Sequence, residues 1–128
     1  MRFRTALAAA AVVLMAACTS APIMNVDKAA VTTASGKALT REQVRSAIVG
    51  AGASLGWTFK DESPNLIVGS LNLRTHTAVV EIPYSESSYS VKYRSSTNLD
   101  EKDGNIHKNY NGWIQNLQRG INARLSAS

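Results

Sequence analysis

The sequence predicts an α+β fold, namely an antiparallel β-meander of about four strands with two helices packed on one face as a two-layer sandwich. Two stretches with apolar residues at helical spacing enclose a central region in which apolar and polar residues alternate. Short turn-forming sequences interrupt that alternation at intervals typical of hairpins. We expect this single domain to span residues 39–128.

The first helix is expected to begin at Thr40. Thr40 and Gln43 have the spacing of a capping box, in which each side chain satisfies a free backbone amide of the other residue. One apolar stripe follows, made by Val44, Ala47, Ile48, Ala51 and Leu55. Gly56 is a typical residue just after a helix end. Gly50 and Gly52 each weaken a helix by about 1 kcal/mol relative to Ala, so either another element packs closely against them or the helix frays.

Strands are expected where the chain alternates with a period of two, at 57–60, 66–74, 77–84 and 89–94. Alternation assigns one side of this sheet to the core, with Trp57, Phe59, Ile67, Gly69, Leu71, Leu73, Ala78, Val80, Ile82, Tyr89, Val91 and Tyr93. The other side should be wet or bound to a partner, and it carries Ser70, Asn72, Arg74, Glu81, Ser90, Lys92 and Arg94.

The last helix is the strongest pattern in the chain. Its apolar stripe repeats at helical spacing over about twenty residues and comprises Ile106, Tyr110, Trp113, Ile114, Leu117, Ile121 and Leu125. Both helices should cover the same side of the sheet. Trp57 and Trp113 are therefore expected to be buried in one core.

The N-terminus has the pattern of a secretory signal peptide in residues 1–17. A cationic start is followed by an apolar run that ends in small side chains. This run is much shorter than the roughly 20 residues that a membrane-spanning helix needs. Residues 18–38 are small and polar without a sustained period, and are expected to form a tether, although Ile23, Val26 and Val31 would also suit a short edge strand.

The end of the signal peptide, Leu14-Met15-Ala16-Ala17-Cys18, resembles the lipobox of Gram-negative lipoproteins, and Cys18 is the only cysteine. This resemblance implies that the Cys18 thiol takes a diacylglyceryl group and that the chain is cut before it and acylated. Two or more acyl chains would hold the protein stably on a membrane. Thr19, in place of the Asp that favours inner-membrane retention, implies the periplasmic leaflet of the outer membrane.

The charge of the chain excludes a strong nucleic-acid partner. Loss of Arg2 and Arg4 with the signal peptide would lower the formal net charge from +5 to +3, a mild excess that is not concentrated on one element. We interpret it as solubility with some affinity for anionic envelope surfaces. Because the one thiol is assigned to lipid, the fold should depend on its core without a disulfide.

Residues 37–125 resemble a group of small, uncharacterised Gram-negative lipoproteins of about this length. The matching segments are Gly36-Lys37, Leu39-Thr40, Gly56-Trp57, Tyr89 to Tyr93, Ser96 to Leu99 and, most specifically, Ile106 to Leu117. The resemblance implies an envelope-facing domain and supplies no activity or substrate.

The sequence predicts no catalytic residues, no metal site and no cofactor. His76 and His107 have no partner at metal-ligand spacing. The serines lie outside any Gly-x-Ser-x-Gly motif. Glu81 and Glu86 are more simply exposed acids of a hairpin than a catalytic pair.

Two groups of residues are candidates for surface binding. His107 and Asn111 form a polar i, i+4 pair that would face a ligand or cap the loop 97–104. Arg74, Lys92 and Arg94 give the outer sheet face a basic bias, which would be simply solvated or would dock an anionic envelope component or an acidic protein. The aromatic residues would serve either as core or as a groove for sugar or peptide.

These observations favour a membrane-anchored envelope lipoprotein that acts as a non-enzymatic binding or assembly module. The alternative from another class is a small hydrolase that acts on an envelope polymer, and a third is an abundant structural coat protein. The absence of a nucleophile, base and orienting residue in one pattern favours the first.

Overall fold

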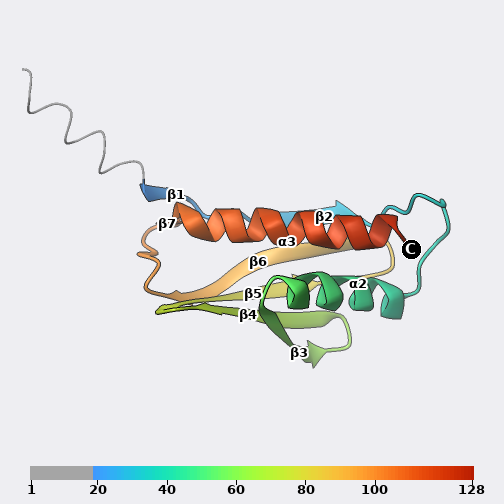
Figure 1. Cartoon of the computed structure of the whole chain (residues 1–128), viewed down its shortest axis with the longest axis horizontal. Helices are drawn as coiled ribbons and strands as arrows, with labels where there is room; N and C mark the ends of the chain where they lie inside the picture. The colour runs from blue at the N-terminus through green and yellow to red at the C-terminus, as the bar shows by residue number, and fades with distance from the viewer. Residues whose placement is uncertain (1–18) are drawn as a thin grey trace, which may run out of the picture.

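The computed structural model describes residues 19–128 and confirms the predicted α+β class (Figure 1). The predicted signal peptide and Cys18 lie outside these residues. The elements along the chain are β1 (Ser20–Pro22), β2 (Val26–Ala30), α2 (Arg41–Ser54), β3 (Trp57–Ser63), β4 (Leu66–Leu73), β5 (His76–Pro83), β6 (Ser88–Thr97), β7 (Asn105–His107) and α3 (Lys108–Ser126).

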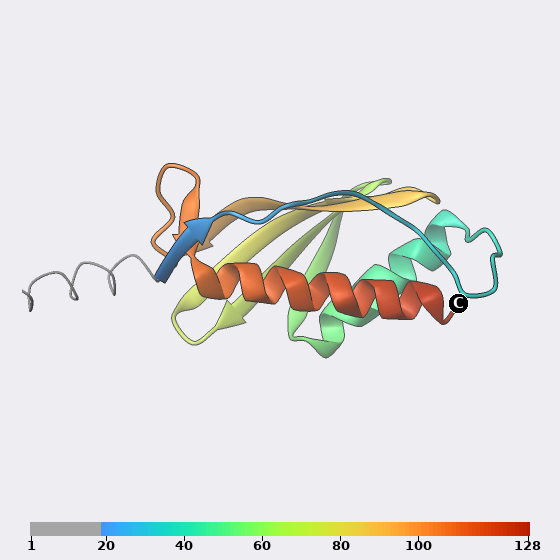
Figure 2. The same cartoon turned by 90° about the horizontal axis from the view of Figure 1, so that it is seen from above.

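The main sheet has five antiparallel strands in the order β2-β6-β5-β4-β3. Its part from β3 to β6 is the predicted meander. A separate two-stranded sheet joins β1 to β7. Figure 2 shows both helices on one face of the main sheet, as the two-layer prediction requires. No helix of residues 19–128 covers the other face.

Helix α2 has the predicted capping box and close packing at both of its glycines. The backbone N–H of Gln43 donates to Thr40 Oγ1 at 3.1 Å, and the N–H of Thr40 donates to Gln43 Oε1 at 2.8 Å. A Cβ at Gly52 would overlap the ring of Phe59, and one at Gly50 would lie 2.7 Å from Arg124 Nη1. The glycines therefore let neighbouring elements approach the helix.

The core lies between the helices and the sheet, and it contains most of the side chains that alternation assigned to it. Leu73 is an exception with 42% of its surface exposed, because it ends β4 next to a turn. Trp113 is half-buried rather than buried, since it lies at the border of the α3 stripe. Ser90, predicted to be wet, is buried because β2 covers it and the N–H of Lys28 donates to its Oγ at 3.0 Å.

The tether prediction is wrong for residues 20–22 and 26–30, which form β1 and β2. Strand β2 pairs with β6, and Val26 is only 4% exposed. The register shifts between Val26 and Ala29, and Lys28 has a φ of 49°. This bulge breaks the alternation by which a strand is identified in a sequence. The alternative of an edge strand was therefore the correct one, and the folded region begins well before residue 39.

The last helix begins at Lys108, two residues later than its apolar stripe suggested. Ile106 is buried but belongs to β7, because a residue just before a helix can share the spacing of its stripe. His107 is the N-cap, and its Nδ1 accepts from the N–H of Asn109 at 3.2 Å. Neither helix in residues 19–128 combines the length and apolar character that crossing a membrane would require.

Candidate functional site

The predicted basic residues of the outer sheet face are not gathered into one patch. Arg94 Nη1 lies 2.7 Å from Glu62 Oε2, and Arg94 Nε lies 3.6 Å from Glu81 Oε1. The hydrogen bond from Arg94 lowers the pKa of the Glu62 carboxyl, and the same bond raises the pKa of Arg94. Arg74 lies in the turn after β4 with a φ of 58°. Lys92 and Arg94 are both exposed on β6, and Lys92 pairs in register with Glu81.

The outer face as a whole mixes small polar, apolar and charged side chains. The strand register places Lys60, Val68, Glu81 and Lys92 in one row across the sheet, and Thr58, Ser70, Val79 and Ser95 in the next. The first row has two lysines, one glutamate and a half-buried valine, and the second row has no charged side chain.

The polar pair His107 and Asn111 holds the N-terminal segment. Asn111 Nδ2 donates to Pro22 O at 2.9 Å, and Asn111 Oδ1 accepts from the N–H of Met24 at 2.9 Å. His107 caps α3, and its own N–H donates to Leu99 O at 2.8 Å. Asn111 thus holds the N-terminal segment rather than capping the loop 97–104, and His107 contacts Leu99 of that loop through its backbone N–H.

The other histidine is also engaged with backbone. His76 Nδ1 lies 2.7 Å from Asn98 O, while Asn98 Nδ2 donates to Thr75 O at 2.7 Å. Neither histidine therefore has its Nδ1 directed at a serine hydroxyl. In residues 19–128, no three His, Cys, Asp or Glu side chains are grouped so that they could hold a metal ion.

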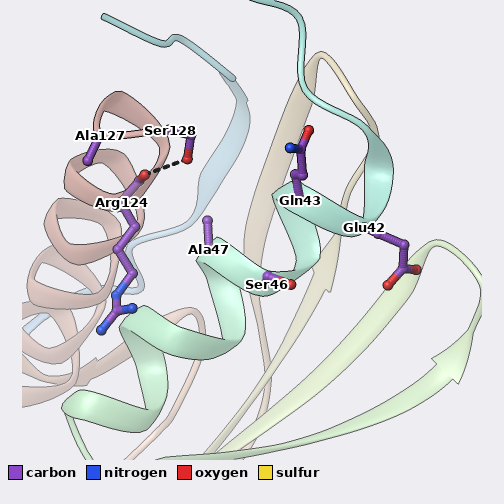
Figure 3. A pocket seen from close by; sticks show the side chains of 7 residues that line it. All are labelled: Glu42, Gln43, Ser46, Ala47, Arg124, Ala127 and Ser128. Atoms are coloured by element: carbon purple, nitrogen blue, oxygen red, sulfur yellow. Dashed lines mark hydrogen bonds between the residues drawn. The ribbon is translucent and has the colours of Figure 1, made fainter.

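An open groove of about 510 Å³ runs between the start of α2 and the end of α3 (Figure 3). Its lining residues are Glu42, Gln43, Ser46, Ala47, Arg124, Ala127 and Ser128. Arg124 lies across α2, where its Nη2 donates to Ser54 Oγ at 3.0 Å. Its backbone carbonyl accepts from Ser128 Oγ at 2.9 Å, and Glu42 points away from α3 (Figure 3). The groove is open, and its lining mixes polar and apolar side chains without converging reactive groups.

Sequence reasoning missed this groove, although a signal for it exists. A Cβ at Gly120 would lie 3.4 Å from Ala51 Cβ, so small residues on both helices meet at their crossing. Small residues at the spacing of one helix face allow two helices to approach closely.

Comparison of the chain with protein-family models, with curated proteins and with solved structures found no match. The functional inference therefore depends on the residues and geometry described above.

Proposed function

We propose that this protein is an envelope lipoprotein, anchored to a membrane through lipid on Cys18, that serves as a non-enzymatic binding or assembly module. One observation carries the proposal. Cys18 is the only cysteine, and it follows a cationic start, an apolar run and two small residues, as in a lipobox. By the same resemblance, Thr19 assigns the protein to the periplasmic leaflet of the outer membrane.

The position of the fold along the chain supports the anchor. The first strand begins at Ser20, and the first buried core residue is Val26. Cleavage before Cys18 would therefore leave every described strand and helix in place. Each buried methylene contributes about 0.8 kcal/mol to membrane binding, so a triacylated Cys18 would anchor the domain without protein contacts.

The available surfaces support a binding module rather than an enzyme. The uncovered sheet face carries small polar side chains with a few charges of both signs, and the groove between the helices is open, with a lining that mixes polar and apolar side chains. Both histidines are engaged with backbone groups. These features favour recognition of an extended or flat envelope partner over chemistry on a small substrate.

The test is the Cys18→Ser variant in the native organism or in a Gram-negative host. It should fold normally yet leave the membrane fraction after a high-salt wash, or remain as an uncleaved precursor. Mass spectrometry of the wild type should find an acylated Cys18 at the mature N-terminus. A freely soluble wild type, or one that begins at another residue, would overturn the proposal. As a matched control, Thr19→Asp should stay acylated and move to the inner-membrane fraction.

A further inference from the structure

The chain passes almost directly from Cys18 into a strand that is fixed to the fold. Ser20 pairs with His107 in the β1–β7 ladder, so Thr19 alone separates Cys18 from a paired residue. The N–H of Ile23 also donates to Gly104 O at 2.9 Å. Paired antiparallel strands have Cα atoms about 5 Å apart, and two residues extend over at most about 7 Å. A lipid on Cys18 is therefore attached within roughly 12 Å of β7.

A chain of hydrogen bonds places the β4–β5 turn at the same end of the molecule. The N–H of His107 donates to Leu99 O at 2.8 Å. The neighbouring Asn98 contacts the turn twice, through Thr75 O and through His76 Nδ1, each at 2.7 Å. Figures 1 and 2 show β1, β7, the start of α3 and the β4–β5 turn together at this end. We call it the anchor end and define it as residues 19–22, 73–76 and 98–113.

The anchor end carries apolar and aromatic surface flanked by cations. Leu73 is one of two large hydrophobic residues in residues 19–128 that are 42% exposed. Trp113 is half-buried on α3, about 8 Å along the helix axis from Lys108. Arg74 follows Leu73 in the chain, Lys108 lines the same surface hollow as Trp113, and both cations are exposed. Tryptophan, an exposed leucine and long cationic side chains are the residues that settle at the boundary of lipid and water.

The formal charges of the anchor end cancel. The cations Arg74, Lys102 and Lys108 stand against three exposed acids, Asp100, Glu101 and Asp103. An attraction that depended on anionic lipid would therefore gain little here. Burial of apolar surface in the headgroup region would contribute instead.

We infer that the anchor end rests on the bilayer surface that holds the Cys18 lipid, with Leu73 and Trp113 entering the interface. This inference depends on the proposed anchor and adds an orientation to it. Because β1 is paired and Asn111 binds the backbone on both sides of Ile23, the domain cannot rotate freely about a tether. The groove near Ser128, at the opposite end of α3, then faces away from the membrane.

The experiment compares two leucines of equal exposure as tryptophan probes. Leu73→Trp and Leu55→Trp are each made in a Trp113→Phe background, and Trp57, which is 3% exposed, remains as the internal reference. Leu55 lies beside Gly120, about 18 Å along α3 from Lys108. The lipidated proteins are purified from membranes and reconstituted into phosphatidylcholine vesicles whose acyl chains are brominated near the headgroup.

Leu73→Trp should lose emission to the bromines, with a blue shift, whereas Leu55→Trp should keep its emission. The difference should persist at high salt, because the contact is apolar. Equal quenching of both probes, or quenching of neither, in protein whose mass shows an acylated Cys18 would overturn the orientation and leave the anchor standing. A purified protein without acyl chains would overturn the orientation together with the anchor. Unchanged Trp57 emission in detergent shows that both variants are folded.

Discussion

The ring of Phe59 lies between Gly52 and Gly69, so a methyl group added at either glycine would meet the ring. A Cβ at Gly52 would lie 2.5 Å from Phe59 Cε2, and one at Gly69 would lie 3.0 Å from Phe59 Cε1. The ring therefore has no room to withdraw from α2 toward β4. Gly52 is required by packing, although it costs the helix about 1 kcal/mol in propensity.

We predict that Gly52→Ala lowers the free energy of unfolding by about 1–3 kcal/mol, because overpacking outweighs the gain in helix propensity. The control is Gly112→Ala in α3, where a Cβ would meet nothing within 4 Å. That change should raise the free energy of unfolding by about 0.5–1 kcal/mol. Urea denaturation measures both. If Gly52→Ala were as stabilising as Gly112→Ala, the position of Phe59 would be wrong.

Two buried tyrosines differ in what their hydroxyls contact. Tyr89 donates to Asn122 Oδ1 at 2.6 Å, whereas in residues 19–128 the hydroxyl of Tyr110 is buried without a hydrogen-bond partner. Tyr89→Phe should lower the free energy of unfolding by about 0.5–1.5 kcal/mol. Tyr110→Phe should leave it unchanged or raise it, because the variant removes a polar atom that gains nothing in the core. Thermal and urea unfolding of the two variants would show the opposite signs.

The same tyrosines make stability depend on pH above neutrality. Burial raises the pKa of Tyr89 from 10.0 to about 12, and burial with the nearby Tyr93 raises the pKa of Tyr110 further. A group whose pKa is higher in the folded protein than in the unfolded chain contributes stability at pH values below its unfolded pKa. That stability is lost as the pH rises through its folded pKa. Urea unfolding near pH 9 and near pH 11 should therefore show a loss in the wild type. The loss should be smaller in a Tyr89→Phe, Tyr110→Phe double variant, and an equal loss would contradict this cause.

Burial at single positions was predictable where alternation or a helical stripe continues on both sides. Ile67 and Val80 are fully buried in mid-strand as expected. The errors lie at borders. Leu73 ends a strand, Trp113 lies at the edge of a stripe, and Ser90 is covered by β2, a strand the sequence pattern did not show. A residue at a border has its environment decided by tertiary structure rather than by its neighbours in sequence.

At the scale of elements, local signals identified the two helices and the meander. The capping box of Thr40 and Gln43 fixes the start of α2, and short turns fix the hairpins. Strands β1 and β2 could not be predicted in the same way, because each pairs with a segment that is distant along the chain, such as His107 for Ser20 and Val91 for Val26. Their pairing is non-local, and the bulge at Lys28 removes the local alternation as well.

Asn111 fastens β1 to α3, and its removal tests whether this segment is part of the fold. In Asn111→Ala, Pro22 O and the N–H of Met24 lose their side-chain partner. The change should cost about 1–2 kcal/mol and speed hydrogen exchange of the Met24 amide. Asn116→Ala, on the exposed face of the same helix, should leave the exchange of Met24 unchanged. If the Met24 amide exchanged as fast in the wild type as in Asn111→Ala, the segment around Met24 would be a loose tether rather than part of the fold.

At the scale of the whole molecule, the candidate sites depended on contacts that no sequence pattern reveals. Arg94 pairs with Glu62, which is 32 positions away in the sequence. The charge that Arg94 was expected to add to the basic bias is therefore balanced by a carboxylate of β3. Asn111 was expected to face a ligand or a loop and instead binds the N-terminal segment. The proposed anchor at Cys18 is different, since its signal is contained in consecutive residues and remains a prediction for the membrane experiment.

The boundary of the domain gives the last prediction. A chain that begins at Leu39 lacks β1 and β2 and so loses the buried Val26, which alone contributes about 1.5–3 kcal/mol. It also loses the partly buried Ile23, Met24, Ala29 and Val31. Since a small domain has only about 5–15 kcal/mol in total and the edge of β6 would be exposed for aggregation, this chain should be largely unfolded or associated.

A chain that begins at Cys18 should instead be monomeric in size-exclusion chromatography and unfold cooperatively in urea, because all five strands of the main sheet are present. Near-UV circular dichroism of the two chains, compared at equal concentration, provides the second measure of core packing. Equal stability of the chain that begins at Leu39 would show that residues 19–38 contribute nothing to the core. The orientation inferred for the anchor end would then fail as well, because a lipid on a detached segment cannot hold the domain at a fixed angle to the membrane.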